Sequence, residues 1–377
     1  MLLEIIWVTL FVLSVVPFGL YLAKMWRVAK RRPWNIKFDE SYEPTISVVV
    51  ATYEEESMIV KKLDNLAQVD YPKEKMELII VDSASRDATV SLSEGWAKKH
   101  PELKMLIIQQ KERKGLVNAI IEGLNNATGE VFIKSDADCM IYPDSIRKAL
   151  KYLPDQQIGS VAGLHRIVSK KETSSVRTEK TYREFYGMLR IGESKLYGTV
   201  LYEGELMLAK RQLLAKIGFD ETVGGDDVAI ALRMALNGYR AITADDCFFV
   251  EQTPYTWKER INQKFRRARH VFQALWKYKF LINRENNVFH KLILPFETYI
   301  YVVNPFFVLL LTLTSIPFVF RYPWLLVFSL VLLIPRVRQM FVTFLSNNWI
   351  MFAAIAMEAR SPEKMTWRKI EEIRETS

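Results

Sequence analysis

Two uncharged apolar stretches, one towards each end of the chain, restrict its fold more than any other feature. Residues 5–23 and residues 298–320 contain no Asp, Glu, Lys or Arg, and each is long enough to cross a bilayer as a helix. The first stretch lacks the basic leading segment and the small-residue cleavage site of a signal peptide, so we expect a membrane anchor. The chain should therefore be an integral membrane protein whose polar middle folds outside the lipid.

Basic residues predict which side of the membrane each segment faces, because cytoplasmic flanks are enriched in Lys and Arg. Five basic residues, from Lys24 to Arg32, directly follow the first apolar stretch. They place the polar middle of the chain in the cytoplasm and the protein in the cell membrane. Residues 298–320 should then cross outward, and residues 322–335 should return.

The last apolar stretch, residues 339–357, is predicted not to cross. Arg336 precedes it, and the tail that follows contains Lys364, Arg368, Lys369 and Arg374, so both of its flanks should be cytoplasmic. Asn347 and Asn348 lie at its centre, where amides would be costly in lipid. The predicted organisation is a transmembrane helix (1–24), a cytoplasmic domain (44–254), an amphipathic interfacial region (255–290), two transmembrane helices with an interfacial or re-entrant segment (296–357), and a cytoplasmic tail (358–377).

Residues 44–254 alternate between short apolar runs that predict buried strands and amphipathic patterns that predict helices. The predicted strands span 46–50, 78–81, 103–108 and 131–133, and the predicted helices span 55–68, 87–99, 114–127 and 143–152. This alternation is typical of an α/β fold with a mostly parallel sheet, whose ligands bind at the carboxyl ends of the strands. Dinucleotide-binding oxidoreductases share the pattern, but the turn at 51–56 lacks the glycines that admit a pyrophosphate.

Two carboxylates follow the strand at 131–133, at the edge where ligands are expected. Asp136 and Asp138 are separated by one residue, and extended backbone places such residues on the same face. Two like charges that close are unfavourable unless they share a cation or one carboxyl stays protonated. A divalent metal (manganese or magnesium) that also binds a diphosphate fits the pair, because hard cations prefer oxygen ligands. A solvated acidic turn is the alternative for this motif taken alone.

Residues 255–285 mix aromatic and basic side chains on a predicted helix, which is typical of a segment lying on a membrane surface. A shorter stretch, about 178–196, is a second candidate. The chain carries 52 basic and 43 acidic residues, a net charge of +9, and this excess suits anionic headgroups or phosphorylated substrates. Nucleic-acid binding would fit the same composition, but the adjacent membrane spans argue against it.

Cysteine and histidine usage excludes two kinds of site. The two cysteines, Cys139 and Cys247, cannot form a disulfide framework and are typical of a reducing compartment. The four histidines show no ligand-like spacing, which argues against a zinc site.

Six motifs in order along the chain carry a family resemblance. They lie at 47–55, 81–89, 114–119, 136–138, 224–227 (with 231–233 and 238–240 downstream) and 263–267. Together with the membrane topology, this set resembles membrane-bound inverting glycosyltransferases of family 2, of the cellulose-synthase and hyaluronan-synthase type. The resemblance covers nearly the whole chain and implies a GT-A (Rossmann-like) catalytic domain with transmembrane and amphipathic interfacial helices. Within the family it favours an archaeal-type membrane mannosyltransferase that uses GDP-mannose.

The resemblance also implies roles for individual residues. Donor binding is assigned to Ala51, Thr52, Tyr53, Glu55, Asp82, Lys114, Asp136, Gln263 and Arg266, and metal binding to Asp138 and Asp136. Asp227 matches the general base, Asp226 is its acidic neighbour, and Arg267, Gly204 and Glu203 fall on the acceptor side, towards the membrane. The implied reaction moves a sugar from a nucleotide donor to a lipid-linked glycan or lipid-phosphate acceptor by a metal-dependent, inverting single displacement.

The assignment of Asp227 agrees with the chemistry of such a reaction. An acceptor hydroxyl must lose its proton as it attacks the anomeric carbon, and a positioned carboxylate can accept that proton. For an Asp-Asp pair taken alone, the alternative is a helix N-cap, where carboxylates are also favoured. Both interpretations can hold at once.

Two positions depart from the family pattern. Arg267 stands where the family has a tryptophan expected to stack on an acceptor sugar, and Ser83 stands where many relatives that use uridine nucleotides have a further aspartate. A guanidinium can grip a phosphate in a bidentate way, so we hypothesise that Arg267 lies near the phosphate of a lipid-linked acceptor. An arginine that merely reaches the membrane interface is the alternative.

Two other functions remain open from the sequence. A processive polysaccharide synthase using a UDP-sugar would need more helices than three spans to enclose its polymer. A catalytically silent membrane scaffold would not need Asp136, Asp138 and Asp227 together.

Overall fold

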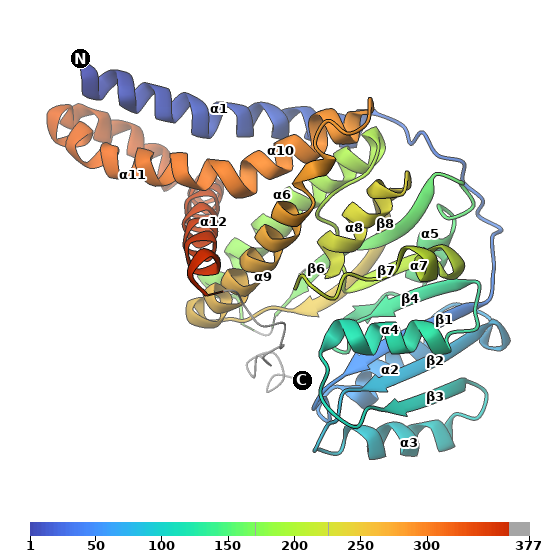
Figure 1. The fold of residues 1–377 in the computed structure, drawn as a ribbon. Helices are drawn as coiled ribbons and strands as arrows, with labels where there is room; N and C mark the ends of the chain where they lie inside the picture. Colours follow the sequence, from blue (N-terminus) through green and yellow to red (C-terminus); the bar gives the residue numbers. More distant parts are fainter. Residues whose placement is uncertain (170, 225, 362–377) are drawn as a thin grey trace.

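The computed structural model describes residues 1–169, 171–224 and 226–361, so most of the predicted tail at 358–377 lies outside the described residues. An eight-stranded sheet with helices on both faces forms the body of the molecule, and long helices extend from one end of it (Figure 1). The predicted α/β class is confirmed.

The sheet is mixed, with the strand order β3-β2-β1-β4-β7-β6-β8-β5. Its strands are β1 (Ile46–Thr52), β2 (Met76–Asp82), β3 (Lys104–Gln109), β4 (Val131–Ser135), β5 (Met140–Ile141), β6 (Ile158–Val168), β7 (Leu206–Lys210) and β8 (Arg240–Gln252). The first four in sequence are the predicted strands and pair in parallel. β7 then runs antiparallel to both β4 and β6, while β8 runs parallel to β6. The carboxyl ends of β1, β2 and β4 therefore meet at one edge.

Side chains alternate between two apolar layers along the strands, which is why helices cover both faces. Val48 and Val50 of β1 face one layer, and Val49 faces the other. The first layer packs against α2 (Ile59–Ala67), α3 (Thr89–Lys99) and α5 (Ser145–Leu150), and the second against α4 (Leu116–Asn126), α7 (Arg211–Ile217) and α8 (Asp226–Leu236). A short 3-10 turn, η1 (Lys73–Lys75), precedes β2.

Two long helices join the sheet to the apolar helices. α6 (Ser174–Leu196) covers the predicted stretch at 178–196, and α9 (Trp257–Lys277) lies within the predicted stretch at 255–285, followed by a 3-10 turn, η2 (Lys279–Leu281). Each begins at a threonine whose hydroxyl accepts a hydrogen bond from the third residue along, Thr173 for α6 and Thr256 for α9. Such caps satisfy amides that the first helical turn leaves without partners.

Three helices are long and apolar enough to cross a membrane: α1 (Leu2–Arg31), the continuous helical segment Phe289–Arg321, and α12 (Pro335–Arg360). The second is built from η3 (Phe289–Ile293), α10 (Leu294–Thr298), η4 (Tyr299–Val303) and α11 (Asn304–Arg321), where η3 and η4 are π-helical turns. Each π turn precedes a proline, Pro295 or Pro305, which cannot donate the next helical hydrogen bond.

The arrangement of these helices bears on the predicted crossings. The predicted return span, 322–335, contains a 3-10 helix, η5 (Pro323–Leu333), and the predicted non-crossing stretch lies inside α12. α1 and α11 run side by side, whereas α12 runs across their direction and along α9 (Figure 1). The number of crossings stays a prediction, and the course of α12 favours an interfacial position for it.

Candidate active site

Two cavities open at the carboxyl edge of the sheet and meet at the paired aspartates. The larger has a volume of about 350 Å³ and the smaller about 60 Å³. Gly115, Leu116, Asp136 and Asp138 line both. The motif predicted to bind metal and diphosphate therefore stands at the junction between two chambers.

The smaller cavity is built from the turns that follow β1 and β2. Ser83 and Arg113 line it together with four predicted donor residues, Ala51, Thr52, Tyr53 and Glu55. The Arg113 guanidinium lies 3.8 Å from the centre of the Tyr53 ring, a cation–π contact that forms part of the wall. In both turns a residue other than glycine has positive φ, Glu54 at 53° and Ala84 at 61°. Such strain persists only where the surroundings enforce it and is concentrated at functional sites.

Asp82 lies behind this cavity and lines neither chamber. It is fully buried, and its carboxylate accepts hydrogen bonds from the Thr52 hydroxyl at 3.2 Å and the Ser85 amide at 2.9 Å. Thr52 and Asp82 are also partners in the β1–β2 register. The structure thus favours a role for Asp82 in holding the two turns together, while its direct contact with a donor stays a prediction.

Asp136 and Asp138 follow β4, where the sheet changes from parallel to antiparallel pairing. The Asp136 amide donates to the Glu205 carbonyl at 3.0 Å, which fixes the turn. Burial raises the pKa of Asp136 to about 6, against the lowering effect of Lys134. Within the described residues, no three His, Cys, Asp or Glu side chains are grouped to hold a metal by themselves. Two carboxylates of this kind suit a hard cation that takes its other oxygens from a diphosphate.

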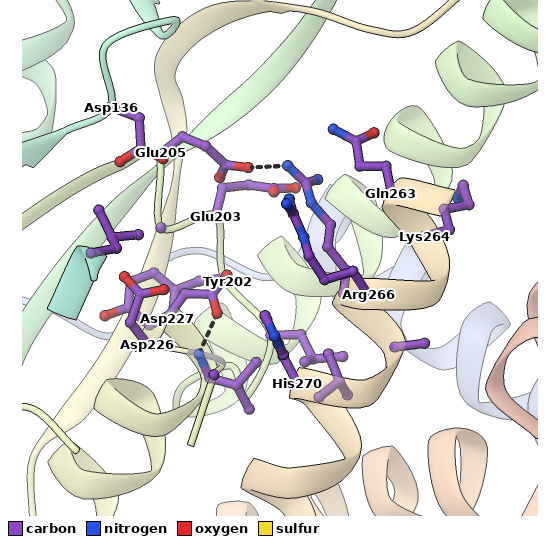
Figure 2. A pocket seen from close by; sticks show the side chains of 18 of the residues that line it. Asp136, Tyr202, Glu203, Glu205, Asp226, Asp227, Gln263, Lys264, Arg266 and His270 are labelled. Atoms are coloured by element: carbon purple, nitrogen blue, oxygen red, sulfur yellow. Dashed lines mark hydrogen bonds and ion pairs between the residues drawn. The ribbon is translucent and has the colours of Figure 1, made fainter. Parts of the chain in front are cut away.

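Asp226 and Asp227 open helix α8 in the wall of the larger cavity (Figure 2). Their position fits both a catalytic pair and a helix N-cap, because negative side chains are favourable at a helix N-terminus. Burial and the neighbouring Asp226 charge raise the pKa of Asp227 to about 6. Gly225, the preceding motif residue, lies outside the described residues. A carboxylate with this pKa can accept a proton near neutral pH.

Gly204 is placed so that Asp227 can approach the backbone. A Cβ atom at Gly204 would stand 2.6 Å from the Asp227 Cβ, closer than such atoms pack. We expect Gly204→Ala to displace Asp227 and lower kcat by about 10²-fold, the usual cost of a misplaced catalytic group, with little change in donor KM. Gly95→Ala is the matched control, because an added Cβ there meets nothing within 4 Å. An unchanged kcat in Gly204→Ala would show that Asp227 does not need this contact.

Helix α9 presents one face to the larger cavity. Gln263 and His270 each lie three or four residues from both Arg266 and Arg267, the spacing that aligns side chains on a helix. Gln263 and Arg266 were predicted for the donor, and both point into the cavity (Figure 2). His270 was missed because a single histidine gives no signal in sequence. Burial and Arg266 lower the pKa of His270 to about 4, so this part of the wall is neutral.

The position of Arg267 does not favour the hypothesis that it grips an acceptor phosphate. Its guanidinium lies 3.0 Å from the Glu205 carboxylate and 3.7 Å from the Glu251 carboxylate. Both partners are buried, and the nearer one, the Glu205 carboxylate, already balances this charge. The residue lines the larger cavity as part of an ion-pair arrangement, and its place on the acceptor side stays a prediction.

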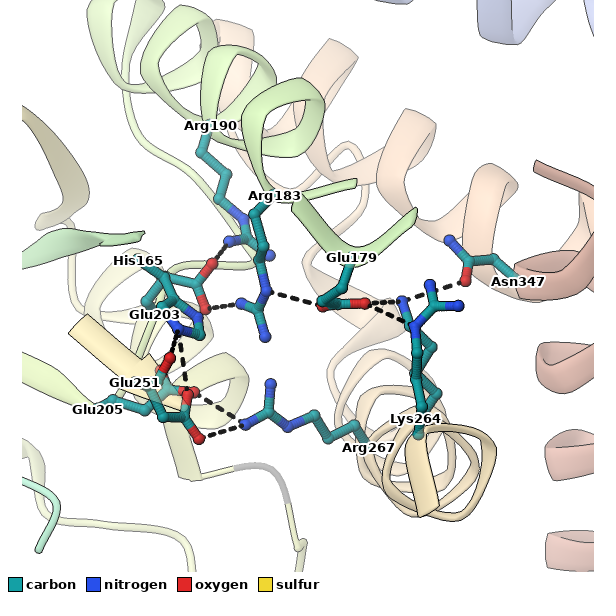
Figure 3. Close-up of polar contacts among 11 residues, drawn as sticks. His165, Glu179, Arg183, Arg190, Glu203, Glu205, Glu251, Lys264, Arg267 and Asn347 are labelled. Atoms are coloured by element: carbon teal, nitrogen blue, oxygen red, sulfur yellow. Dashed lines mark hydrogen bonds and ion pairs between the residues drawn. The ribbon is translucent and has the colours of Figure 1, made fainter. Parts of the chain in front are cut away.

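Glu203 belongs to a larger set of buried ion pairs, here called the α6–α9 network (Figure 3). The network consists of Glu203 with Arg183 (2.6 Å) and Arg190, and Glu179 with Arg183 (3.0 Å), Arg260 (3.1 Å) and Lys264 (3.1 Å). It joins α6, α9 and the segment before β7, and it forms the wall opposite α8. Sequence reasoning could place Glu203 here but could not identify partners more than a helix turn away.

The larger cavity continues to the long apolar helices. Lys114, from the loop before α4, lines it at the sheet end, while Tyr301, Asn347, Ile350 and Met351 line it at the other. Asn347 of α12 lies 3.4 Å from the Lys264 ammonium. A single chamber therefore connects the paired aspartates with side chains of the apolar helices.

Lys134 is the main site residue that sequence reasoning missed. Its ammonium lies 2.9 Å from the Asp226 carboxylate, 3.3 Å from the Asp136 carboxylate and 2.9 Å from the Gly204 carbonyl. The available signal was a lysine inside an otherwise apolar strand, two residues before the motif. Lysine is rarely fully buried unless paired, so that position predicts an acidic partner.

The chain is similar to known glycosyltransferases. Residues 47–218 match the family described as glycosyl transferase family 2. The structure is similar to that of mannosyltransferase PcManGT from Pyrobaculum calidifontis, solved in complex with GDP-Man and Mn²⁺, with a TM-score of 0.79, 32% identity, and coverage of 95% of this chain and 99% of that chain. Probable glycosyltransferase YdaM of Bacillus subtilis is 26% identical over 307 residues, 76% of this chain and 72% of that protein.

A synthase shows a more distant similarity. The poly-beta-1,6-N-acetyl-D-glucosamine synthase of Staphylococcus epidermidis is 23% identical over 242 residues, 62% of this chain and 58% of that protein. The match to PcManGT extends over nearly the full length of both chains. The chain belongs to glycosyl transferase family 2 and is an inverting hexosyltransferase.

Proposed function

We propose that this enzyme transfers mannose from GDP-mannose to a hydroxyl of a lipid-linked glycan, with a divalent metal, at the cytoplasmic face of the cell membrane. One observation carries the proposal: two cavities meet at Asp136 and Asp138, and Asp227 lies in the larger. A nucleotide sugar has a nucleoside at one end, a sugar at the other and a diphosphate between them. The smaller cavity, the carboxylate pair and the larger cavity would take the nucleoside, the diphosphate and the sugar, in that order.

Similarity to a protein bound to GDP-Man supports the choice of donor. The nucleoside would occupy the smaller cavity, beside the Tyr53 ring that Arg113 covers. Ser83 also lines this cavity, where relatives that use uridine nucleotides often carry a carboxylate. Its hydroxyl donates to Gln110 at 2.9 Å, so the wall there is neutral and polar.

The chain's own residues would stabilise the departing diphosphate. Asp136 and Asp138 would hold the metal together with diphosphate oxygens, and a metal bound there neutralises the charge that develops on the leaving group. Arg266 from α9 and Lys114 from the loop before α4 bring positive charge to the same cavity. Donors placed in advance lower a barrier more than donors that must reorganise.

Asp227 would take the acceptor proton from the opposite side of the sugar. Attack from that face inverts the anomeric carbon, so an α-linked donor would give a β-linked product. Asp226 would not compete for the proton, because its carboxylate is engaged by Lys134 at 2.9 Å.

The arrangement of charges favours a hydroxyl acceptor over a lipid phosphate. A phosphate oxygen is already deprotonated and needs no base, and it would be repelled by the carboxylates of Asp226 and Asp227. On the acceptor side, the basic side chains pair with protein carboxylates: Arg183, Arg190, Lys264 and Arg267. The acceptor sugar would lie between Asp227 and the side of the cavity formed by these ion pairs.

The lipid part of the acceptor would lie towards the membrane helices. Ile350 and Met351 give that end of the chamber an apolar lining next to α12. The basic segment after α1 supports a cytoplasmic catalytic domain, because such flanks face the cytoplasm. A processive polymer synthase is the second candidate, but the described helices offer few spans to enclose a polymer.

Donor identity can be tested by thermal shift with GDP-, UDP- and dTDP-sugars, each with and without Mn²⁺. We expect GDP-mannose with Mn²⁺ to raise the Tm most, because a ligand at 100 times its Kd stabilises the fold by about 2.7 kcal/mol. GDP-glucose is the control for the sugar, and GDP-mannose with a chelator is the control for the metal. A larger shift with a UDP-sugar would contradict the proposed donor.

A further inference from the structure

Lys134 lies in the centre of the sheet, at the end of β4 that faces both cavities. Its neighbours in the register are Val49 of β1 and Met207 of β7, so strands flank it on both sides. The side chain is only 5% exposed. It shares the sheet face of Phe132, the face covered by α4 and α8. A charge in this position must be compensated by its surroundings.

Three acceptors from three separate segments surround the ammonium. They are the carboxylate of Asp136 after β4, the carbonyl of Gly204 before β7, and the carboxylate of Asp226 at the start of α8. The Gly204 carbonyl accepts a hydrogen bond from it at 2.9 Å, and the two carboxylates are ion-pair partners, Asp226 at 2.9 Å and Asp136 at 3.3 Å. Asp227 follows Asp226 directly, and its Cβ packs against Gly204. The contacts therefore tie the segment that bears the base to the segment that bears the metal-side carboxylate.

We propose that Lys134 is a positioning residue that sets the distance between the donor side and the base side of the active site. In this role Lys134 contacts neither the anomeric carbon of the donor nor the hydroxyl of the acceptor. It acts through Asp136, Asp226 and Gly204. The inference rests on the proposed function, in which Asp136 faces the donor and Asp227 accepts the acceptor proton. It adds a lysine whose positive charge, one hydrogen bond and two ion pairs hold two acidic segments together.

This role predicts a separation between binding and transfer in Lys134→Met, which keeps the chain length and removes the charge. Without the lysine, Asp226 loses its partner and Asp227 moves, so kcat should fall by about 10²-fold. Binding of Mn²⁺ with GDP should be unchanged or tighter, because a positive charge near Asp136 has been removed. A residue needed only for folding would weaken both together.

Lys210→Met is the matched control. Lys210 is also a strand lysine, but it lies at the opposite end of the β4–β7 pair and bonds to the Asp155 carbonyl at 3.0 Å. It lines neither cavity, and we expect its loss to leave kcat and Mn²⁺–GDP affinity near those of the wild type. The assays are steady-state transfer and calorimetric titration of GDP in the presence of Mn²⁺.

A double variant keeps the test decisive if Lys134→Met does not fold. Lys134→Met with Asp226→Asn removes the charge and one of its partners, so it should fold, bind Mn²⁺ with GDP and still transfer slowly. Where Lys134→Met also folds, the losses in kcat of the two single variants should be less than additive in the double variant, because both substitutions break the same contact. Transfer by either Lys134 variant within threefold of the wild type, or parallel loss of binding and transfer, would overturn the proposal. Failure of the wild type to bind any GDP ligand would instead refute the proposed function.

Discussion

Asp227→Asn is expected to slow glycosyl transfer by about 10²–10⁴-fold, the usual contribution of a general base. The amide keeps the shape of the side chain and can still accept from the Val228 amide, which bonds to the carboxylate at 2.8 Å. Donor binding should persist, because the residue lies in the larger cavity, away from the nucleoside chamber. The measurements are kcat for transfer and Kd for GDP with Mn²⁺.

The pH dependence of the wild type provides a second readout for the same residue. Burial, Asp226 and Glu205 raise the pKa of Asp227 to about 6, while Lys134 opposes them. A base works only when it is ionised, so transfer should be full above this pKa and should fall as the pH drops through about 6. The residual transfer by Asp227→Asn should lose that dependence.

Asp226→Asn is the matched comparison. Asp226 carries the same functional group one residue earlier, but Lys134 engages it. If Asp226→Asn abolished transfer while Asp227→Asn worked normally, the base would be Asp226, and the motif would be aligned one residue out of place.

Asp138→Ala is expected to remove metal-dependent donor binding while the protein still folds. Loss of a residue that only supports a metal ligand costs about 10–100-fold in affinity, so loss of a ligand should cost at least about 10²-fold. Asp138 is partly exposed at the junction of the two cavities and makes no hydrogen bond or ion pair with the described residues. Its removal should therefore have little effect on the Tm of the protein without ligand.

The measurement is Mn²⁺-dependent binding of GDP, followed by the increase in Tm. Asp70→Ala is the control, because that carboxylate is 68% exposed and lines neither cavity. If Asp138→Ala bound GDP with undiminished Mn²⁺ dependence, the metal would be held elsewhere.

The parallel half of the sheet could be predicted because each strand has a strong local signal. β1, β2 and β4 are fully or almost fully buried, and their apolar runs are bounded by turn residues. β6 and β8 were missed for physical reasons. β6 contains glycines that fit closely against other segments, and its pairing with β8 is interrupted by two register shifts. Neither feature follows from the spacing of apolar residues.

The site was predictable to the extent that its residues lie at strand ends or follow a family motif. Asp136 and Asp138 were placed at the correct edge by strand direction alone, and Asp227 was found through its motif. The partners of buried charges were not predictable, because Lys134 with Asp226 and Arg267 with Glu205 are joined only by the fold. That is why Arg267 suggested a free phosphate-binding group in the sequence and proved to be paired in the structure.

The α6–α9 network has a consequence for how the enzyme responds to heat. Burying its charged groups costs hydration free energy, and at 25 °C the ion pairs repay little more than that cost. As temperature rises, hydration of charged groups becomes less favourable, so the penalty of keeping them out of water shrinks. The stabilisation that an apolar contact provides per unit of buried area does not grow in the same way. On warming, the contacts between the sheet and helix α9 should therefore weaken less than the contacts within the purely apolar layers. The side of the larger cavity that the α6–α9 network forms should keep its structure close to the melting temperature.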